Sequence, residues 1–173
     1  MIRLFFSGIL LIMGIAACNQ NEKKTSDQQK TSHNHVTDFK KMQWLVGCWK
    51  GEYGNKPFYE AWRKLNDTLL MNYSIEISGT DTLVKAGSPL NVHSGNIYLG
   101  AKDSVNWMLS AVTEKEIILK NDTLKYSNVI TWRNTTDGHW YTILKDAKNT
   151  VTYDLVRMPE LDVAVDRFIK SKK

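Results

Sequence analysis

Cysteine and proline are scarce in this chain, which has two cysteines and three prolines among 173 residues. Cys18 falls in a targeting segment described below, so Cys48 is the only thiol left for the folded domain, and an internal disulfide is excluded. The sequence also lacks a glycine-rich phosphate loop, a Gly-x-Ser-x-Gly nucleophile motif and a zinc-ligand signature. We therefore name no catalytic residue and no metal ligand, and we expect a protein that is not an enzyme.

A strong excess of one charge is missing as well. The chain carries 23 Lys and Arg against 18 Asp and Glu, a net charge of +5, and these residues are scattered along the sequence. Such a balance gives no basic groove, so we expect no nucleic-acid partner. The 42% of hydrophobic and 10% of aromatic residues are ordinary for a globular domain, and the many aromatics favour sheets.

No hydrophobic run is long enough for a comfortable membrane span. The longest, Leu4–Ile15, has the layout of a secretory signal, so residues 1–17 are predicted to be a signal peptide. Ala16 and Ala17 directly before Cys18 resemble the lipobox of bacterial lipoproteins. That resemblance implies acylation of Cys18, anchoring to a membrane and a place in the cell envelope. Asn19, where an inner-membrane lipoprotein would carry Asp, favours the outer membrane of a Gram-negative bacterium.

Residues 18–37 are predicted to form a disordered tether that follows the lipidated cysteine. The segment contains almost no apolar side chain after Cys18, so it buries too little surface to offset the entropy of ordering. His33 and His35 lie in it, but two histidines without an acidic or cysteine partner make an incomplete metal site. We therefore read both as solvated tether residues.

Residues 38–173 are predicted to form one all-β domain. A short helix is expected over Asp38–Leu45 with Asp38 as its N-cap, and an amphipathic helix over Pro159–Lys170. Between them, turn signals separate about ten strand-like runs by short connections, which require antiparallel neighbours. The fold class is thus an antiparallel up-and-down β-barrel of about ten strands. The expected strands are Gly47–Tyr53, Phe58–Leu65, Thr68–Ser78, Thr82–Pro89, Asn96–Ala101, Val105–Val112, Glu116–Lys120, Asn128–Asn134, His139–Lys145 and Thr150–Met158.

Period-two alternation along these strands predicts one dry and one wet face. On that basis we expect seven large or polar side chains to line the barrel interior as candidate ligand contacts: Glu60, Trp62, Tyr73, Tyr98, Trp107, Trp132 and Tyr141. The alternation around Glu60 fits two orientations of its side chain. It either faces the interior, where it orients a ligand or pairs with Arg133, or faces outward with Tyr59 and Ala61 turned inward.

Gly47-Cys48-Trp49 at the start of the first strand resembles the Gly-x-Trp signature of lipocalins and their calycin relatives. The resemblance implies a β-barrel that holds small hydrophobic molecules or, in some branches, haem. It also implies that an arginine on the last strand, here Arg157, lies across the ring of Trp49 as a structural clasp.

A group of bacterial lipocalin-like domains shares further motifs with this chain, including Glu60-Ala61-Trp62 and Leu69-Leu70-Met71-Asn72-Tyr73. The likeness covers roughly residues 42–157. A His-Asp pair typical of that group is replaced here by Leu124-Lys125, so we carry over the fold and no functional residue.

Three further residues have two readings each. Cys48 is expected to be a small apolar filler and not a reactive thiol, because no neighbouring base is apparent to lower its pKa. His93 and His139 lack the spacing of a metal pair, although either could serve as the single axial ligand of a haem. We expect no cofactor, with haem as the minor alternative.

These features favour a monomeric, lipid-anchored binding protein that holds a small hydrophobic or amphipathic ligand inside the barrel. The alternative is a non-catalytic envelope protein with a filled barrel that acts through its outer surface.

Overall fold

The computed structural model describes residues 34–101, 104, 106–135 and 137–172, all within the compact unit Ser32–Lys173. The predicted signal peptide, the predicted acylation site Cys18 and the part of the predicted tether up to His33 lie outside the described residues.

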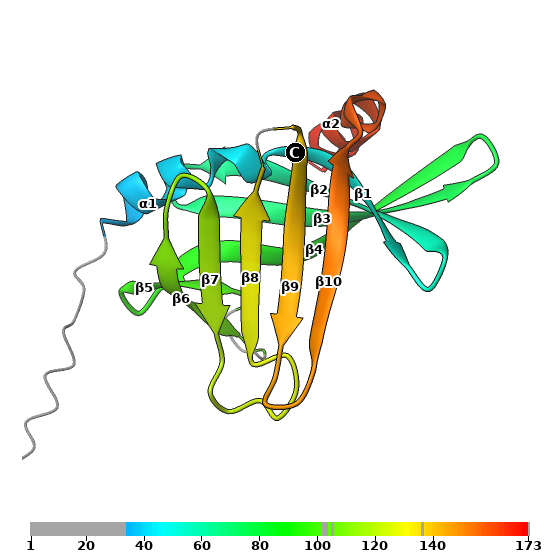
Figure 1. Cartoon of the computed structure of the whole chain (residues 1–173). Coiled ribbons are helices and arrows are strands. Elements are labelled where there is room, and N and C mark those ends of the chain that lie inside the picture. Colours follow the sequence, from blue (N-terminus) through cyan, green and yellow to red (C-terminus); the bar gives the residue numbers. More distant parts are fainter. Residues whose placement is uncertain (1–33, 102–103, 105, 136, 173) are drawn as a thin grey trace, which may run out of the picture. The chain divides into compact units, whose positions relative to one another are not determined.

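Ten antiparallel strands close into an up-and-down barrel in which each strand pairs with its sequence neighbours and β1 pairs with β10 (Figure 1). This is the predicted fold class, and the architecture is compatible with a lipocalin-like fold. The strands are β1 Gly47–Tyr53, β2 Lys56–Asn66, β3 Leu69–Ser78, β4 Asp81–His93, β5 Asn96–Leu99, β6 Trp107–Val112, β7 Glu116–Lys120, β8 Val129–Asn134, β9 His139–Lys145 and β10 Thr150–Arg157.

The N-terminal helix begins earlier than predicted. Helix α1 covers His35–Lys41, and the side chain of Asn34 caps it by accepting a hydrogen bond from the backbone N–H of Thr37. A 3₁₀ turn, η1, follows over Gln43–Leu45. Asp38 is therefore a buried residue inside the helix and not its N-cap. An Asn side chain caps as well as Asp does, so two capping residues within one turn leave the start ambiguous from sequence.

Strand β4 continues four residues beyond its predicted end at Pro89. The pairing with β3 shifts between Met71 and Tyr73, which leaves Gly87 and Ser88 without direct partners before Pro89 pairs with Met71. Proline is tolerated in a strand at such a bulge, because the bulge already interrupts the ladder there. The turn signal at Pro89 thus marks a bulge and not the end of the strand.

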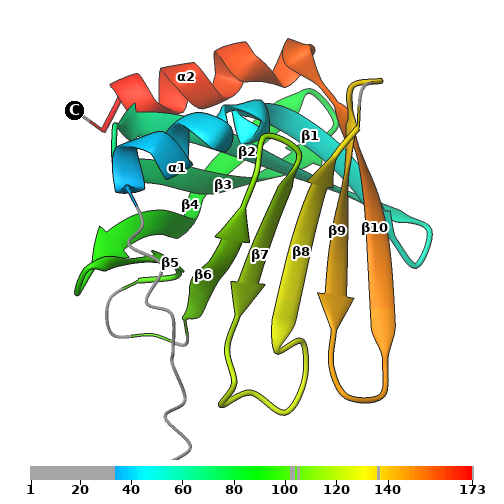
Figure 2. The same ribbon diagram turned by 60° about the vertical axis from the view of Figure 1, so that its left-hand side comes forward.

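Two separate apolar clusters hold the domain together. The larger fills the barrel, and its end is closed by Phe39 and Met42 of the α1 region and by Leu45, each at most 1% exposed. The smaller lies on the outer wall of β1–β4, beneath the C-terminal segment formed by η2 (Pro159–Leu161) and α2 (Asp162–Lys170). Figure 2 shows α2 lying along the outside of this part of the sheet. The predicted amphipathic C-terminal helix is confirmed.

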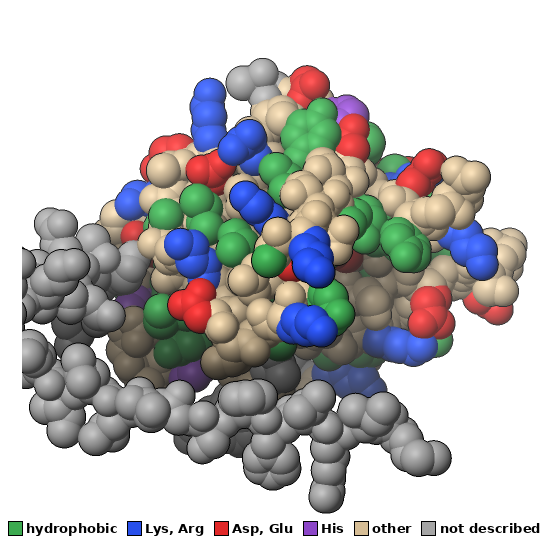
Figure 3. All heavy atoms as spheres, turned by 60° about the horizontal axis from the view of Figure 1, so that its bottom comes forward, with side chains coloured by type: hydrophobic (Ala, Val, Ile, Leu, Met, Phe, Trp, Pro, Cys, Tyr) green, Lys and Arg blue, Asp and Glu red, His purple; other side chains and the backbone are tan. Residues whose placement is uncertain are grey.

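The described surface is mixed in charge. On the face that Figure 3 shows, basic and acidic side chains are interspersed. Among the described residues, no helix combines the length and the apolar character needed to cross a membrane.

Candidate functional site

Four of the seven predicted interior residues lie inside the barrel. Trp62 and Trp132 are part of the interior cluster, their ring centroids 5.3 Å apart, and Trp107 packs against the same cluster. Glu60 shares a face of β2 with Trp62 and accepts a hydrogen bond from its indole N–H at 3.2 Å. The outward alternative for Glu60 is therefore wrong.

The three tyrosines of the predicted set face outward. Tyr73 pairs with Ala61, on the face of β2 opposite to Trp62, and packs under α2 against Phe168. Tyr98 follows the interior residue Ile97 and stacks on the outer wall against His93, with ring centroids 3.9 Å apart.

Tyr141 pairs with Arg133 and Asp154, while its neighbour Trp140 is the residue of that strand that enters the core. Each of the three strands has apolar or aromatic residues on both faces, so alternation alone does not say which face is enclosed.

Trp140 is the interior residue that the sequence analysis missed. It is 1% exposed, and its ring meets those of Trp44, Trp49 and Trp132 edge to face, with centroids 5.6 to 6.0 Å apart. Its indole N–H finds no hydrogen-bond acceptor in the described part of the chain. The local pattern does not single it out, because Tyr141 and Ile143 make the opposite face of β9 as apolar as the face of Trp140.

The barrel interior is packed unevenly. Leu45, Leu70 and Ile117 have no exposed surface. Seven other inward-facing side chains are only half-buried: Phe58, Glu60, Asn72, Val92, Trp107, Leu144 and Tyr153. Part of the interior lining is therefore accessible to solvent, beside the tightly packed tryptophans around Trp140.

Glu60 is the one acidic side chain among these inward-facing residues. Burial raises the pKa of its carboxyl group to about 7, although hydrogen bonds from the side chains of Trp62 and Asn72 act to lower it. No Lys, Arg or His of the described residues forms an ion pair with Glu60. The predicted pairing with Arg133 is wrong, because Arg133 lies on the outer wall in an ion pair with Glu116 at 2.6 Å.

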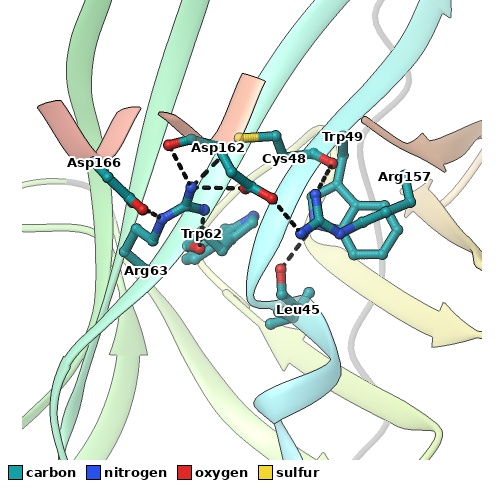
Figure 4. A network of polar contacts seen from close by, with 8 residues as sticks. All are labelled: Leu45, Cys48, Trp49, Trp62, Arg63, Arg157, Asp162 and Asp166. Carbon is teal, nitrogen blue, oxygen red and sulfur yellow. Dashed lines mark hydrogen bonds and ion pairs between the residues drawn. The ribbon is translucent and has the colours of Figure 1, made fainter. Parts of the chain in front are cut away.

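Arg157 and Trp49 form the contact that the sequence analysis expects. The guanidinium carbon of Arg157 lies 5.6 Å from the centroid of the Trp49 ring, and the two residues pair between β10 and β1 (Figure 4). The indole N–H of Trp49 donates to the backbone oxygen of Leu45 at 2.8 Å, which fixes the turn before the strand. Arg157 also donates to the backbone oxygen of Cys48 at 3.0 Å.

Asp162, the first residue of α2, joins this clasp to a second arginine. One carboxylate oxygen accepts from Arg157 and the other from Arg63 of β2, each at 2.7 Å, and Arg63 also reaches Asp166 at 2.8 Å (Figure 4). Partial burial acts to raise the pKa of Asp162, but the hydrogen bond from Arg157, that from Cys48 and the two positive charges outweigh it and hold the pKa below its usual value. The network ties α2 to the first, second and last strands.

Cys48 lies fully buried beneath the same network. Burial, together with its hydrogen bond to Asp162, raises the pKa of the thiol to about 11, although Arg63 acts in the opposite direction. The group is therefore a neutral thiol at physiological pH, and it packs with Ala61 and Tyr73 in the outer cluster.

Neither candidate haem ligand faces the interior. His93 stacks on Tyr98 on the outer wall. His139 lies on the outer wall as well, with Nδ1 3.0 Å from Asp154. The histidines of the described strands are thus not placed to bind a group inside the barrel.

Comparison of the chain with protein-family models, with curated proteins and with solved structures finds no match.

Proposed function

We propose that this protein is a lipid-anchored, lipocalin-like protein of the cell envelope whose barrel binds a small amphipathic molecule through a basic or hydrogen-bond-donating group. The observation that carries the proposal is Glu60, an inward-facing carboxyl group without a cationic partner among the described residues. A buried carboxylate is costly unless it is paired, and binding sites use one or a few such groups to orient an otherwise apolar ligand.

The surroundings of Glu60 supply the apolar part of such a site. Phe58 and Tyr153 meet edge to face with centroids 5.8 Å apart, and the ring of Trp62 lies beside the carboxyl group. These rings are large enough to cover a hydrocarbon segment, and aromatic faces also attract cations. An amine on an apolar stem therefore matches both the charge and the lining.

The proposed place in the envelope rests on the lipobox-like Ala16-Ala17-Cys18. Several acyl chains on Cys18 would hold the chain on a membrane, most simply the outer membrane. A barrel attached in this way would meet small amphiphiles close to the lipid surface.

A second candidate is a structural protein with a filled barrel. The tryptophan cluster around Trp140 favours it, because a packed core contributes stability and leaves no room for a ligand among these rings. The two candidates differ in whether the inward-facing carboxyl group of Glu60 binds a ligand.

Three eight-carbon probes, octylamine, octanol and octanoate, separate the contribution of the charged head group from that of the hydrocarbon chain. We expect the full chain, held in zwitterionic nanodiscs at pH 8, to bind octylamine more tightly than octanol or octanoate, as followed by tryptophan fluorescence against empty nanodiscs. Glu60→Gln should weaken octylamine binding by at least about tenfold, since a hydrogen bond to a charged group contributes about 1.5–3 kcal/mol. Octanol binding should stay within about twofold, because it uses the stem and the aromatic rings alone.

Glu76→Gln is the matched control, since Glu76 is exposed and already paired with Lys85 at 2.6 Å. It should leave the binding of all three probes unchanged. Equal octylamine affinity of the wild type and Glu60→Gln would overturn the proposal and leave the filled barrel as the better account.

A further inference from the structure

A cleft on the outer wall of the barrel lies between α2 and strands β2–β4. Its volume is about 420 Å³, and its lining consists of Leu65, Tyr73, Ala86, Phe168, Ile169 and Lys172. The size falls within the range of small-molecule sites, and all but one of the lining side chains are apolar or aromatic. Because Tyr73 faces away from the interior, the cleft is separated from Glu60 by the sheet itself.

The cleft exists because α2 covers the sheet incompletely. The apolar stripe of α2 starts with Val165, which is fully buried against the strands. It continues with Phe168 and Ile169, which are only half-buried. Opposite them β4 presents Ala86, whose short side chain leaves the space open. The C-terminal part of the apolar face of α2 therefore lines a cleft and is not packed against the sheet.

Tyr73 contributes a polar atom to this apolar lining. The residue is 5% exposed, and its hydroxyl group makes no hydrogen bond within the described part of the chain. The hydroxyl oxygen is not enclosed by the protein, so it can donate a hydrogen bond into the cleft. A ligand with an acceptor oxygen in the cleft would accept this hydrogen bond.

The charge at the cleft is positive. Lys172 lines it, with Nζ 5.6 Å from the centroid of the Phe168 ring. On the same helix Arg167 and Lys170 form no ion pair with any described residue. Of the carboxylates near the helix, Asp162 and Asp166 are engaged by Arg63, and no acidic side chain is among the described lining residues. The cleft thus combines an apolar floor, a hydroxyl donor and one cation, Lys172, with Arg167 and Lys170 elsewhere on α2.

We infer that this cleft binds a long-chain carboxylate, with the chain lying between α2 and the sheet and the head group at Lys172 and Tyr73. An ammonium from Lys172 and a hydroxyl from Tyr73 can both donate to one carboxylate. The same-length alcohol would keep the apolar contacts and lose the charge.

A photoreactive fatty acid tests this inference on the protein as it exists in its host membrane. A sixteen-carbon carboxylic acid with a diazirine in the chain is irradiated with intact membranes, and adducts are mapped by mass spectrometry. We expect adducts on the peptides that contain Tyr73 or Phe168 and Ile169. The corresponding alcohol probe should label these peptides about three to five times less, in line with a partly exposed ion pair.

Ala86→Leu should abolish the labelling, because the larger side chain occupies the cleft without removing any existing contact. Ala111→Leu, at an exposed position of β6, is the matched control and should label like the wild type. Lys172→Gln should lower labelling by the acid to the level of the alcohol. Glu60→Gln should leave the labelling of the cleft peptides unchanged. The inference about the cleft and the function proposed for the barrel interior can therefore be contradicted independently.

Two results would overturn the inference. One is labelling of Ala86→Leu equal to that of the wild type. The other is mapping of the adducts to the interior peptides that contain Trp132 or Trp140 alone.

Discussion

The guanidinium group of Arg157 occupies the space that a side chain at Gly47 would need. A Cβ atom built on Gly47 would lie 2.4 Å from Cζ of Arg157, and the φ angle of Gly47 is +147°, where residues with side chains rarely sit. Arg157 reaches this position by lying across Trp49. The glycine and the tryptophan of the first strand are therefore both explained by one arginine from the last strand, and this contact joins the two ends of the barrel.

Replacement of Arg157 by alanine is expected to lower the free energy of unfolding by about 2–3 kcal/mol. The variant loses the cation–π contact, the hydrogen bond to Cys48 and one partner of Asp162. Denaturant unfolding measures the change. Arg133→Ala removes an exposed ion pair with Glu116 and should change the same quantity by less than about 1 kcal/mol. Equal effects of the two variants would show that the clasp contributes nothing particular to the fold.

Asp162 is the carboxylate on which two arginines converge. Asp162→Asn leaves the half-buried side chains of Arg63 and Arg157 without their shared counter-charge, so we expect a loss of about 2 kcal/mol in unfolding free energy. Asp166→Asn, one turn further along the helix, removes only a more exposed partner of Arg63 and should cost less than about 1 kcal/mol. Because the pKa of Asp162 is lowered in the folded state, its contribution should fade as the pH falls through that lowered pKa.

Glu60 is expected to make stability fall as the pH rises. Its pKa is raised on folding from 4.5 to about 7, so the folded state holds the proton more tightly than the unfolded chain does. The stabilisation is complete below pH 4.5, and it is lost as the pH rises to about 7, for a total of up to about 3 kcal/mol. Denaturant unfolding of the wild type and Glu60→Gln at pH 5 and pH 8 isolates this contribution. A pH dependence that is the same in both proteins would contradict the assignment.

Cys48 should resist alkylation in the folded protein. Burial raises the pKa of its thiol to about 11, so almost no thiolate is present at pH 8, and the side chain has no exposed surface. Iodoacetamide followed by peptide mass spectrometry should find Cys48 unmodified before denaturation and fully modified after it. Rapid modification of the folded protein would show that α2 leaves its place and opens the outer cluster.

The strand order and the N- and C-terminal helices could be predicted from sequence, because short turns between alternating runs allow few other arrangements. Which face of each strand is turned to the barrel interior could not be predicted from sequence. Along β3 the sequence predicts Tyr73 inside, but Tyr73 lies with Met71 and Ile75 in the outer cluster under α2. The interior face carries Leu70 and Asn72. Helix α2 buries part of the outer wall, so apolar residues occur on that face as well as on the interior face. The sequence pattern of a strand does not distinguish the two buried faces.

The same physical reason explains why four of the seven predicted interior residues lie inside the barrel and three lie on the outer wall. Glu60 and Trp62 lie inside on a face of β2 that they share with Phe58, whereas Tyr98 and Tyr141 lie on strands with apolar residues on both faces and point outward. The outer cleft could not be predicted, since it depends on where Phe168 comes to rest relative to Ala86. Such distances are set by tertiary packing and leave no mark in the local sequence.

The binding function proposed for the barrel is tested most directly by native mass spectrometry of the protein purified from its own host membranes. The account predicts a retained small molecule with a basic group in the wild type and in Tyr141→Leu, an outer-wall change, and its loss in Glu60→Leu. A wild-type protein that carries no small molecule, or one retained equally by Glu60→Leu, would contradict it.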